Sequence, residues 1–122
     1  MILVDTSIWI DHLRSNQKPL VEALRTGLVL CHPFVIGELA LGSLRDRAMV
    51  LAMLSELPQA AVAGTEEVLI FLEHHHLFGL GIGYIDAHLL ASIRLTPNCQ
   101  LWTRDRRLGD AADRLELRWH SG

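Results

Sequence analysis

Four acidic residues of the chain lie inside apolar segments or directly at their ends. Asp5 follows the run ILV, Glu38 lies within PFVIGELAL, Asp86 follows the glycine-rich GIG, and Asp105 lies in LWTRD. Carboxylates gathered in one place would repel one another, and some would take up protons. A divalent cation removes that penalty, and an all-oxygen ligand set favours Mg²⁺ or Mn²⁺ over zinc. The chemistry typical of such a site is phosphodiester hydrolysis, in which the metal activates water and stabilises charge on the phosphate.

Each acid, taken alone, also has a simpler explanation. Asp is strongly favoured at the start of helices, so Asp5, Asp86 and Asp105 could each be a helix cap or a loop residue. Glu38 could lie on the exposed face of a helix. The interpretation as a metal site therefore depends on the four carboxylates being brought together by the fold.

Short apolar runs alternate with amphipathic segments along the chain. Strands are predicted at 1–4, 28–32, 60–63, 99–103 and 116–119, and helices at 6–15, 18–27, 33–44, 45–57, 65–79 and 84–95, with a loop and helix at 104–115. Thr6 is predicted to be the N-cap of the first helix. This alternation predicts an α/β fold with a short, mostly parallel central sheet flanked by helices on both faces. In such sheets ligands bind beyond the carboxyl ends of the strands, where Asp5 and Asp105 are expected.

Composition narrows the class of protein. The 122 residues suit one domain, residues 1–122, and half of them are apolar. No apolar run is long enough for a membrane span, and the N-terminus lacks the basic region of a secretory signal, so we expect the cytoplasm. In that compartment Cys31 and Cys99 are expected to be reduced core residues. The net charge of −3 argues against a dedicated duplex-DNA binder, but not against an enzyme that acts on nucleic acid through bound cations.

Four segments together, LVDTSIWID, VIGELALG, GIGYIDAHLLASI and LWTRDRRL, resemble PIN-domain ribonucleases, and more narrowly the toxin subunit of VapBC toxin–antitoxin pairs. The resemblance covers residues 2 to about 119 and implies the PIN-domain fold. It also implies a Mg²⁺-dependent endoribonuclease, with Mn²⁺ able to substitute, that acts as the toxic component of a type II pair.

Carried over by position, the resemblance assigns catalytic and metal-binding roles to Asp5, Glu38, Asp86 and Asp105, and flanking hydroxyl positions to Thr6, Ser7 and Thr103. Leu108 stands where the family often has an aromatic residue. The fourth acid is the family's least constant ligand, so Asp110 remains an alternative to Asp105.

Arginine supplies nearly all of the positive charge, because Lys18 is the single lysine. Arg14, Arg104, Arg106 and Arg107 could contact RNA phosphates, the last three at the mouth of the predicted site. Arginine also pairs readily with carboxylates, so these side chains could instead orient Asp105. The sequence leaves both interpretations open.

The resemblance further implies an RNA substrate, a homodimer and a cognate VapB-type antitoxin. We expect the antitoxin to lay an amphipathic segment on the helices around 33–57 and to direct a basic side chain at the acidic pocket. Apolar stripes such as 49–54 are expected to pack between two copies. The alternatives are a non-catalytic PIN-like interaction module and a nuclease acting on DNA. A phosphorylation receiver domain is disfavoured because it needs a lysine late in the chain. The identity of the RNA and the number of metals are left open.

Overall fold

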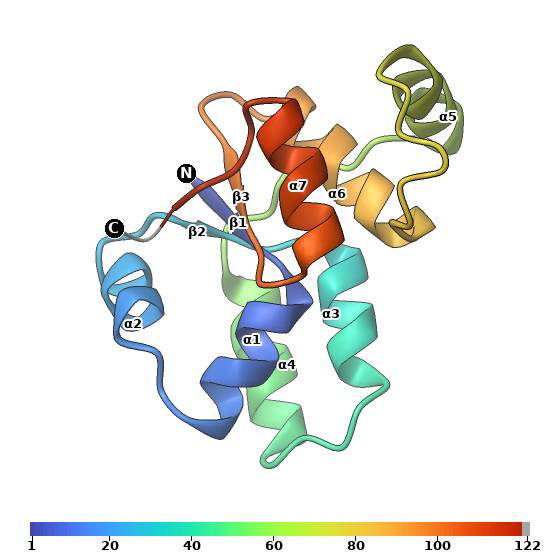
Figure 1. Ribbon diagram of the computed structural model, residues 1–122. Helices are drawn as coiled ribbons and strands as arrows, with labels where there is room; N and C mark the ends of the chain where they lie inside the picture. The colour runs from blue at the N-terminus through green and yellow to red at the C-terminus, as the bar shows by residue number, and fades with distance from the viewer. Residues whose placement is uncertain (121–122) are drawn as a thin grey trace.

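Three short strands form the centre of the computed structural model, which describes residues 1–120 (Figure 1). In chain order the elements are β1 (Ile2–Val4), α1 (Thr6–Arg14), α2 (Lys18–Arg25), β2 (Val29–Leu30), α3 (Pro33–Ala40), α4 (Arg47–Glu56), α5 (Thr65–His74), α6 (Tyr84–Leu95), β3 (Gln100–Trp102) and α7 (Arg106–Arg114). None of the helices in this described part has the length and apolar character required to cross a membrane.

The sheet is parallel throughout and has the strand order β2-β1-β3. In its register Ile2 lies opposite Val29 on one side and Gln100 on the other, and Val4 lies opposite Trp102. The central strand is buried along its whole length, which explains why its sequence is continuously apolar rather than alternating. Because all three strands run the same way, their carboxyl ends meet at one edge of the sheet.

The order of the strands also determines where helices lie. The chain passes from β1 to β2 on one side and then returns past β1 to reach β3 on the other. Parallel crossovers are right-handed, so this reversal assigns α1 and α2 to one face and the helices between β2 and β3 to the other. Figure 1 agrees, since α1 is drawn in front of α4 and α7 in front of α6. The predicted α/β fold with a parallel sheet is therefore confirmed.

The core gathers on this sheet and on the inner faces of the helices. Leu3, Leu101 and Trp9 are fully buried there. Cys31 and Cys99 are also buried and are not joined to each other, as expected for reduced core residues. Burial of this continuous apolar cluster is what orders the strand ends that carry Asp5 and the segment before Asp105.

Two predicted strands are wrong. In the segment 60–63, Ala60 and Ala63 are buried, but the only sheet-like pairing nearby is a single bridge between Gln59 and Cys31. The segment 116–119 makes one bridge, through Arg118, because the chain leaves α7 through a left-handed residue at 116 (φ 59°). The helices predicted at 33–44, 45–57 and 65–79 are each shorter than expected, ending at residues 40, 56 and 74.

Candidate active site

Asp5 lies directly after β1, and its side chain is almost completely buried. Its main-chain N–H extends the sheet by donating to the carbonyl of Trp102, at 2.9 Å. Asp5 occupies the N-cap position of α1, yet its carboxylate caps no helix N–H. Oδ2 accepts instead from the hydroxyls of Ser7, at 2.9 Å, and Thr103, at 2.8 Å. The simple cap explanation therefore fails for this side chain, and the prediction that Thr6 is the N-cap is also wrong.

The turn between β3 and α7 carries Thr103 and Asp105 to the same place. Thr103 is buried, and its hydroxyl accepts from the N–H of Asp105 at 3.0 Å while donating to Asp5. The N–H of Arg104 donates to the hydroxyl of Ser7 at 3.0 Å. Asp105 is the N-cap of α7, and one of its oxygens, Oδ1, accepts from a helix N–H at 2.9 Å. Asp105 is thus a cap, but the cap uses one carboxylate oxygen and leaves the other free.

Glu38 reaches the site from α3 and is half-buried. This helix begins at Pro33, after His32, whose Nδ1 accepts from the N–H of Phe34 at 3.0 Å and so caps the first turn. Oε1 of Glu38 accepts from the hydroxyl of Thr6 at 2.7 Å. That bond joins α3 to the first residue of α1, directly beside Asp5.

Asp86 lies in the first turn of α6, and Oδ2 accepts from the N–H of Gly83 at 3.2 Å. Burial raises the pKa of Asp86 to about 6, although the bond from Gly83 acts in the opposite direction. Repulsion from the charges of Asp5, Asp105 and Glu38 contributes to the same rise of the Asp86 pKa, by less than burial does. The other three carboxylates predicted from the sequence are therefore close enough to perturb Asp86.

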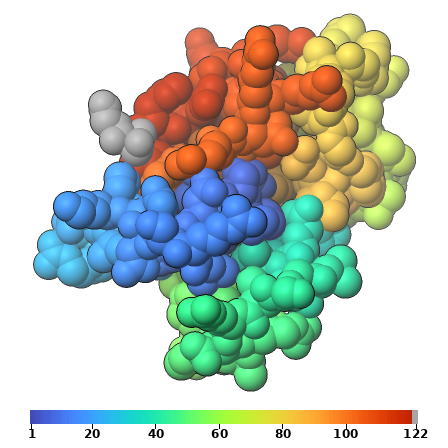
Figure 2. Space-filling view, turned by 60° about the horizontal axis from the view of Figure 1, so that its bottom comes forward, coloured from blue at the N-terminus to red at the C-terminus, as the bar shows by residue number. Residues whose placement is uncertain are grey.

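The four acids share a second property. One oxygen of each is held by a hydroxyl or a main-chain N–H, and within residues 1–120 the other oxygen accepts no hydrogen bond. Asp110, the alternative fourth acid, is exposed and is not among the charges that raise the pKa of Asp86. Figure 2 shows the segments that carry these residues, from the beginning, middle and end of the chain, meeting on one face.

The donor set fits a divalent cation, although the described conformation of residues 1–120 brings no three His, Cys, Asp or Glu side chains close enough to ligate one ion. Mg²⁺ typically keeps several waters and uses only one or two carboxylates directly. Four free carboxylate oxygens, and the mutual repulsion that raises the pKa of Asp86, are the chemistry that such an ion neutralises. Asp5, Glu38, Asp86 and Asp105 are the residues that would hold it.

Arg104 makes contacts with α1 on both its main chain and its side chain. Its Nε lies 2.7 Å from Oδ2 of Asp11, whose side chain is 26% exposed. The side chain of Arg104 itself is 63% exposed. Arg104 therefore pairs with Asp11 and not with Asp105, and contact with RNA phosphates stays a prediction.

The other three predicted arginines are exposed. Arg107 lies over the loop before α6, because a Cβ at Gly81 would come within 2.8 Å of its Nη1. Arg106 makes no ion pair or side-chain hydrogen bond within residues 1–120, and Arg14 makes none either. These side chains remain available to an anionic ligand.

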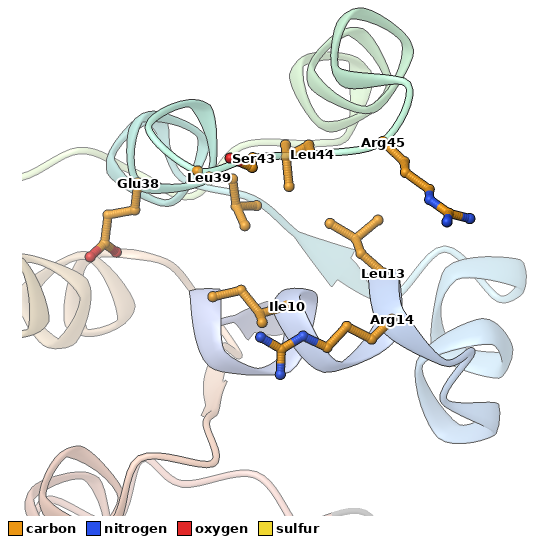
Figure 3. A pocket seen from close by; sticks show the side chains of 9 residues that line it. Ile10, Leu13, Arg14, Glu38, Leu39, Ser43, Leu44 and Arg45 are labelled. Atoms are coloured by element: carbon orange, nitrogen blue, oxygen red, sulfur yellow. The ribbon is translucent and has the colours of Figure 1, made fainter.

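A pocket of about 580 Å³ opens beside Glu38, between α1 and the segment that joins α3 to α4. Its apolar lining comes from Ile10, Leu13, Leu39 and Leu44, and its charged lining from Arg14, Arg45 and Glu38. In Figure 3 the apolar side chains face one another across the pocket, Glu38 and Arg45 stand at opposite ends, and Arg14 extends its guanidinium along α1 toward Ile10.

Sequence reasoning missed Asp11, Arg45 and the N–H of Gly83. A signal existed for Asp11, because it lies four residues after Ser7 and so shares a helix face with a predicted site residue. No comparable signal existed for Arg45, which reaches the pocket from an irregular segment.

Comparison with known proteins found a family and a named relative that the chain resembles. The family described as the PIN domain matches residues 2–114 of the chain. The protein named Ribonuclease VapC32, from two strains of Mycobacterium tuberculosis, is 50% identical over 108 residues, which cover 88% of this chain and 87% of that protein.

Proposed function

The chain belongs to the PIN-domain family, and from this premise we propose that it is an endoribonuclease of the VapC type, dependent on Mg²⁺ or Mn²⁺. The observation that carries the proposal is the convergence of four carboxylates from β1, α3, α6 and the start of α7, three of which raise the pKa of the fourth. The name of the relative supports RNA as the substrate and a toxin–antitoxin pair as the setting.

In this proposal different residues bind the cation, orient the carboxylates and attract the RNA. Asp5, Glu38, Asp86 and Asp105 hold the cation through their free oxygens, while hydroxyls orient two of them. When bound, a divalent cation supplies an activated water and stabilises charge on the attacked phosphate. Arg106 and Arg107, exposed beside Asp105, are placed to attract the RNA backbone.

The decisive experiment replaces Asp5 with Asn. Asn keeps the volume and an acceptor for the two hydroxyls but removes the charge, so we expect RNA cleavage to fall by at least about a hundredfold with the fold intact. Thermal stability in metal-free buffer should stay equal or rise, because repulsion among the carboxylates is relieved. Cleavage by the variant at the wild-type rate, or full wild-type activity in EDTA, would refute the proposal.

Matched variants identify the fourth acid. Asp105→Asn keeps the cap of α7, because Asn caps helices as well as Asp does, and removes only the charge. Asp110→Asn removes an exposed charge from the same helix. We expect a large loss of cleavage from the first variant and almost none from the second; the reverse result would reassign the role to Asp110.

The same assays separate the alternatives. Single-stranded RNA and DNA of one sequence, incubated with Mg²⁺ or Mn²⁺, distinguish a ribonuclease from a nuclease acting on DNA. A non-catalytic module would bind RNA or protein but cleave neither substrate, and Asp5→Asn would then leave that binding unchanged.

We also propose that the pocket of Figure 3 receives a cognate VapB-type antitoxin. The lining of the pocket is complementary to an amphipathic peptide. Its apolar side chains would lie between α1 and the α3–α4 segment, and its acidic side chains would lie beside Arg14 and Arg45. A basic side chain at the opposite end would pair with Glu38 and compete with the cation for the acidic site.

The antitoxin proposal is tested with Leu13→Glu, which places a charge in the apolar lining, and with Val21→Glu on α2 as a control of similar exposure elsewhere. We expect the first variant to lose the complex and the second to keep it. Inhibition should weaken as Mg²⁺ is raised. Equal inhibition by a peptide with its basic residues changed to Glu, at every metal concentration, would exclude the acidic site as its target.

We further propose that the protein forms a homodimer through exposed apolar side chains on α4 and α5. Met49 on α4 and Leu69 and Ile70 on α5 are each more than half exposed, whereas Leu54, in the same predicted stripe as Met49, is completely buried within the chain. Exposed apolar side chains of this kind are typical of contact surfaces. Light scattering should show a dimer at micromolar concentration, and Ile70→Glu or Met49→Glu should shift it toward monomer; a wild-type monomer would refute this part.

A further inference from the structure

We propose that the ion pair between Asp11 and Arg104 is a positioning device for the active site, so that Arg104 affects cleavage by holding the 103–105 turn against α1 rather than by binding RNA. The inference rests on the proposed function, since it concerns the same acidic site. Its structural part, the order of the turn, can be measured without any substrate.

Two separate groups of Arg104 contact α1. The main-chain N–H donates to the hydroxyl of Ser7 at 3.0 Å, and the guanidinium lies 2.7 Å from Oδ2 of Asp11. Ser7 and Asp11 are four residues apart on one helix and therefore face the same way. The residue at the centre of the turn is thus attached to α1 at two points, one at the level of Asp5 and one a helical turn further on.

Both carboxylates at the strand ends depend on the position of this turn. Thr103, directly before Arg104, donates to Oδ2 of Asp5 at 2.8 Å and accepts from the N–H of Asp105 at 3.0 Å. Ser7, which receives the N–H of Arg104, donates to the same oxygen of Asp5 at 2.9 Å. A displacement of the turn away from α1 would stretch these bonds together and move two of the four acids.

The buried carboxylate oxygen of Asp11 holds the exposed side chain of Arg104 in place. Oδ2 of Asp11 is buried and accepts no hydrogen bond, so the guanidinium of Arg104 is its charge partner. The rest of the arginine side chain is largely exposed, and partly exposed ion pairs add little to global stability. Breaking the pair should therefore loosen the turn without unfolding the protein.

A role in positioning and a role in RNA binding predict opposite effects for Asp11→Asn. If Arg104 bound phosphate, removing the charge of Asp11 would release the arginine, and RNA binding would stay equal or tighten. If the pair positions the turn, Asp11→Asn and Arg104→Ala should be similarly harmful, because each removes the attraction between the two opposite charges. Arg104→Lys, which can keep the pair, should recover much of the activity.

The experiment measures cleavage kinetics for Asp11→Asn, Arg104→Ala, their double variant and Arg25→Ala. Arg25 pairs with Glu22 on the exposed surface of α2, with 2.9 Å between the charged atoms, and provides the control. We expect kcat to fall about tenfold in both single variants, less than the hundredfold cost that a misplacement of about 1 Å can carry. KM and its salt dependence should be unchanged, the double variant should be no worse than either single variant, and Arg25→Ala should match wild type.

Amide hydrogen exchange provides the readout that is independent of activity. The N–H groups of Arg104 and Asp105, which donate to the hydroxyls of Ser7 and Thr103, should exchange faster in Asp11→Asn and not in Arg25→Ala. Wild-type kcat together with unchanged exchange in Asp11→Asn would overturn the inference, as would a raised KM and a weaker salt dependence confined to Arg104→Ala. If Asp5→Asn cleaves normally while the exchange result holds, the proposed function fails and the structural coupling stands.

Discussion

The two halves of the acidic site are built in different ways. Asp5 and Asp105, beyond the ends of the adjacent strands β1 and β3, are linked through the buried Thr103 and the hydroxyl of Ser7. Glu38 and Asp86 come from helices, and each is held by a single bond, from a hydroxyl on α1 and from a main-chain N–H respectively. The strand half has its geometry set by the sheet and by buried hydroxyls, while the helix half has more freedom.

The two halves also differ in titration, and here the helix half is the one with the unusual property. On the helix side burial and the other three acids raise the pKa of Asp86 to about 6, so this carboxyl is the one whose ionisation state changes near neutral pH. In a site of this kind, one half can fix the positions of the carboxylates while the other contains the carboxyl group whose ionisation depends on the surrounding charges. Breaking a bond in the strand half should therefore disturb structure, and changing the helix half should disturb titration.

Thr103→Val should give the largest effect among variants that keep all four acids. Valine has nearly the same shape, but Asp5 loses a donor at 2.8 Å and the N–H of Asp105 loses its acceptor. Because these groups are largely buried, we expect unfolding free energy to fall by about 1–3 kcal/mol, with cleavage reduced at least about tenfold. Urea denaturation at constant m-value measures the first effect. A variant as stable and active as wild type would show that the hydroxyl does not set the geometry of the strand half.

The titration of Asp86 should produce the next largest effect. Its pKa is raised from 3.8 to about 6, so between these values the folded protein binds more protons than the unfolded chain. The contribution of Asp86 to stability is therefore fully present at the acid end of this window and is lost as pH rises through about 6. Asp86→Asn should remove that dependence and stabilise the metal-free protein above pH 6.

Cleavage should change with pH in the other direction. The cation must displace the proton of Asp86, so activity should fall as pH is lowered through about 6, and higher Mg²⁺ should move the fall to lower pH. Rates measured between pH 5 and 8 at several Mg²⁺ concentrations test this prediction. An acid limb that does not move with Mg²⁺ would mean that another group controls it.

The elements that carry the site could be predicted because each has a local signal. The buried run ILV followed by Asp5, and LWT followed by Arg104 and Asp105, predict strand ends directly, and the glycine loop before α6 predicts a helix start that places Asp86 in the first turn. The prediction of a strand at 60–63 is wrong because apolar residues can be buried equally well in an irregular segment that pairs with no neighbouring strand.

The contacts within the site could not be predicted, since they join residues far apart in the sequence. The donor Thr103 is 98 residues from Asp5, and the bond from Thr6 to Glu38 spans 32 residues. The side chain of Arg104 suits phosphate and carboxylate equally, and its pairing with Asp11 could not be predicted because it depends on how α1 and the 103–105 turn meet in three dimensions.

Gly81→Ala should have a smaller effect, confined to the loop that leads to the helix half. Gly81 has φ +78°, and a Cβ there would lie 2.8 Å from Nη1 of Arg107. Gly79 has nearly the same backbone, with φ +75°, but open space around the Cβ position. Both Ala variants should cost about 1 kcal/mol in backbone strain. Only Gly81→Ala should also displace Arg107 and weaken RNA binding, so equal RNA affinities for the two variants would argue against a role for Arg107 at this loop.

Thr6→Val should have the smallest effect. It makes the same Thr-to-Val change as Thr103→Val, but in the helix half, so the two variants can be compared directly. The hydroxyl of Thr6 donates to Oε1 of Glu38 at 2.7 Å, but both residues are only half-buried, so water can replace the lost donor. We expect unfolding free energy to fall by less than about 1 kcal/mol, and cleavage to fall only a few-fold. A double-mutant cycle with Glu38→Gln measures the coupling between the two side chains. If Thr6→Val proves as damaging as Thr103→Val, the helix half is held as firmly as the strand half, and the contrast between the two halves does not describe how this site is built.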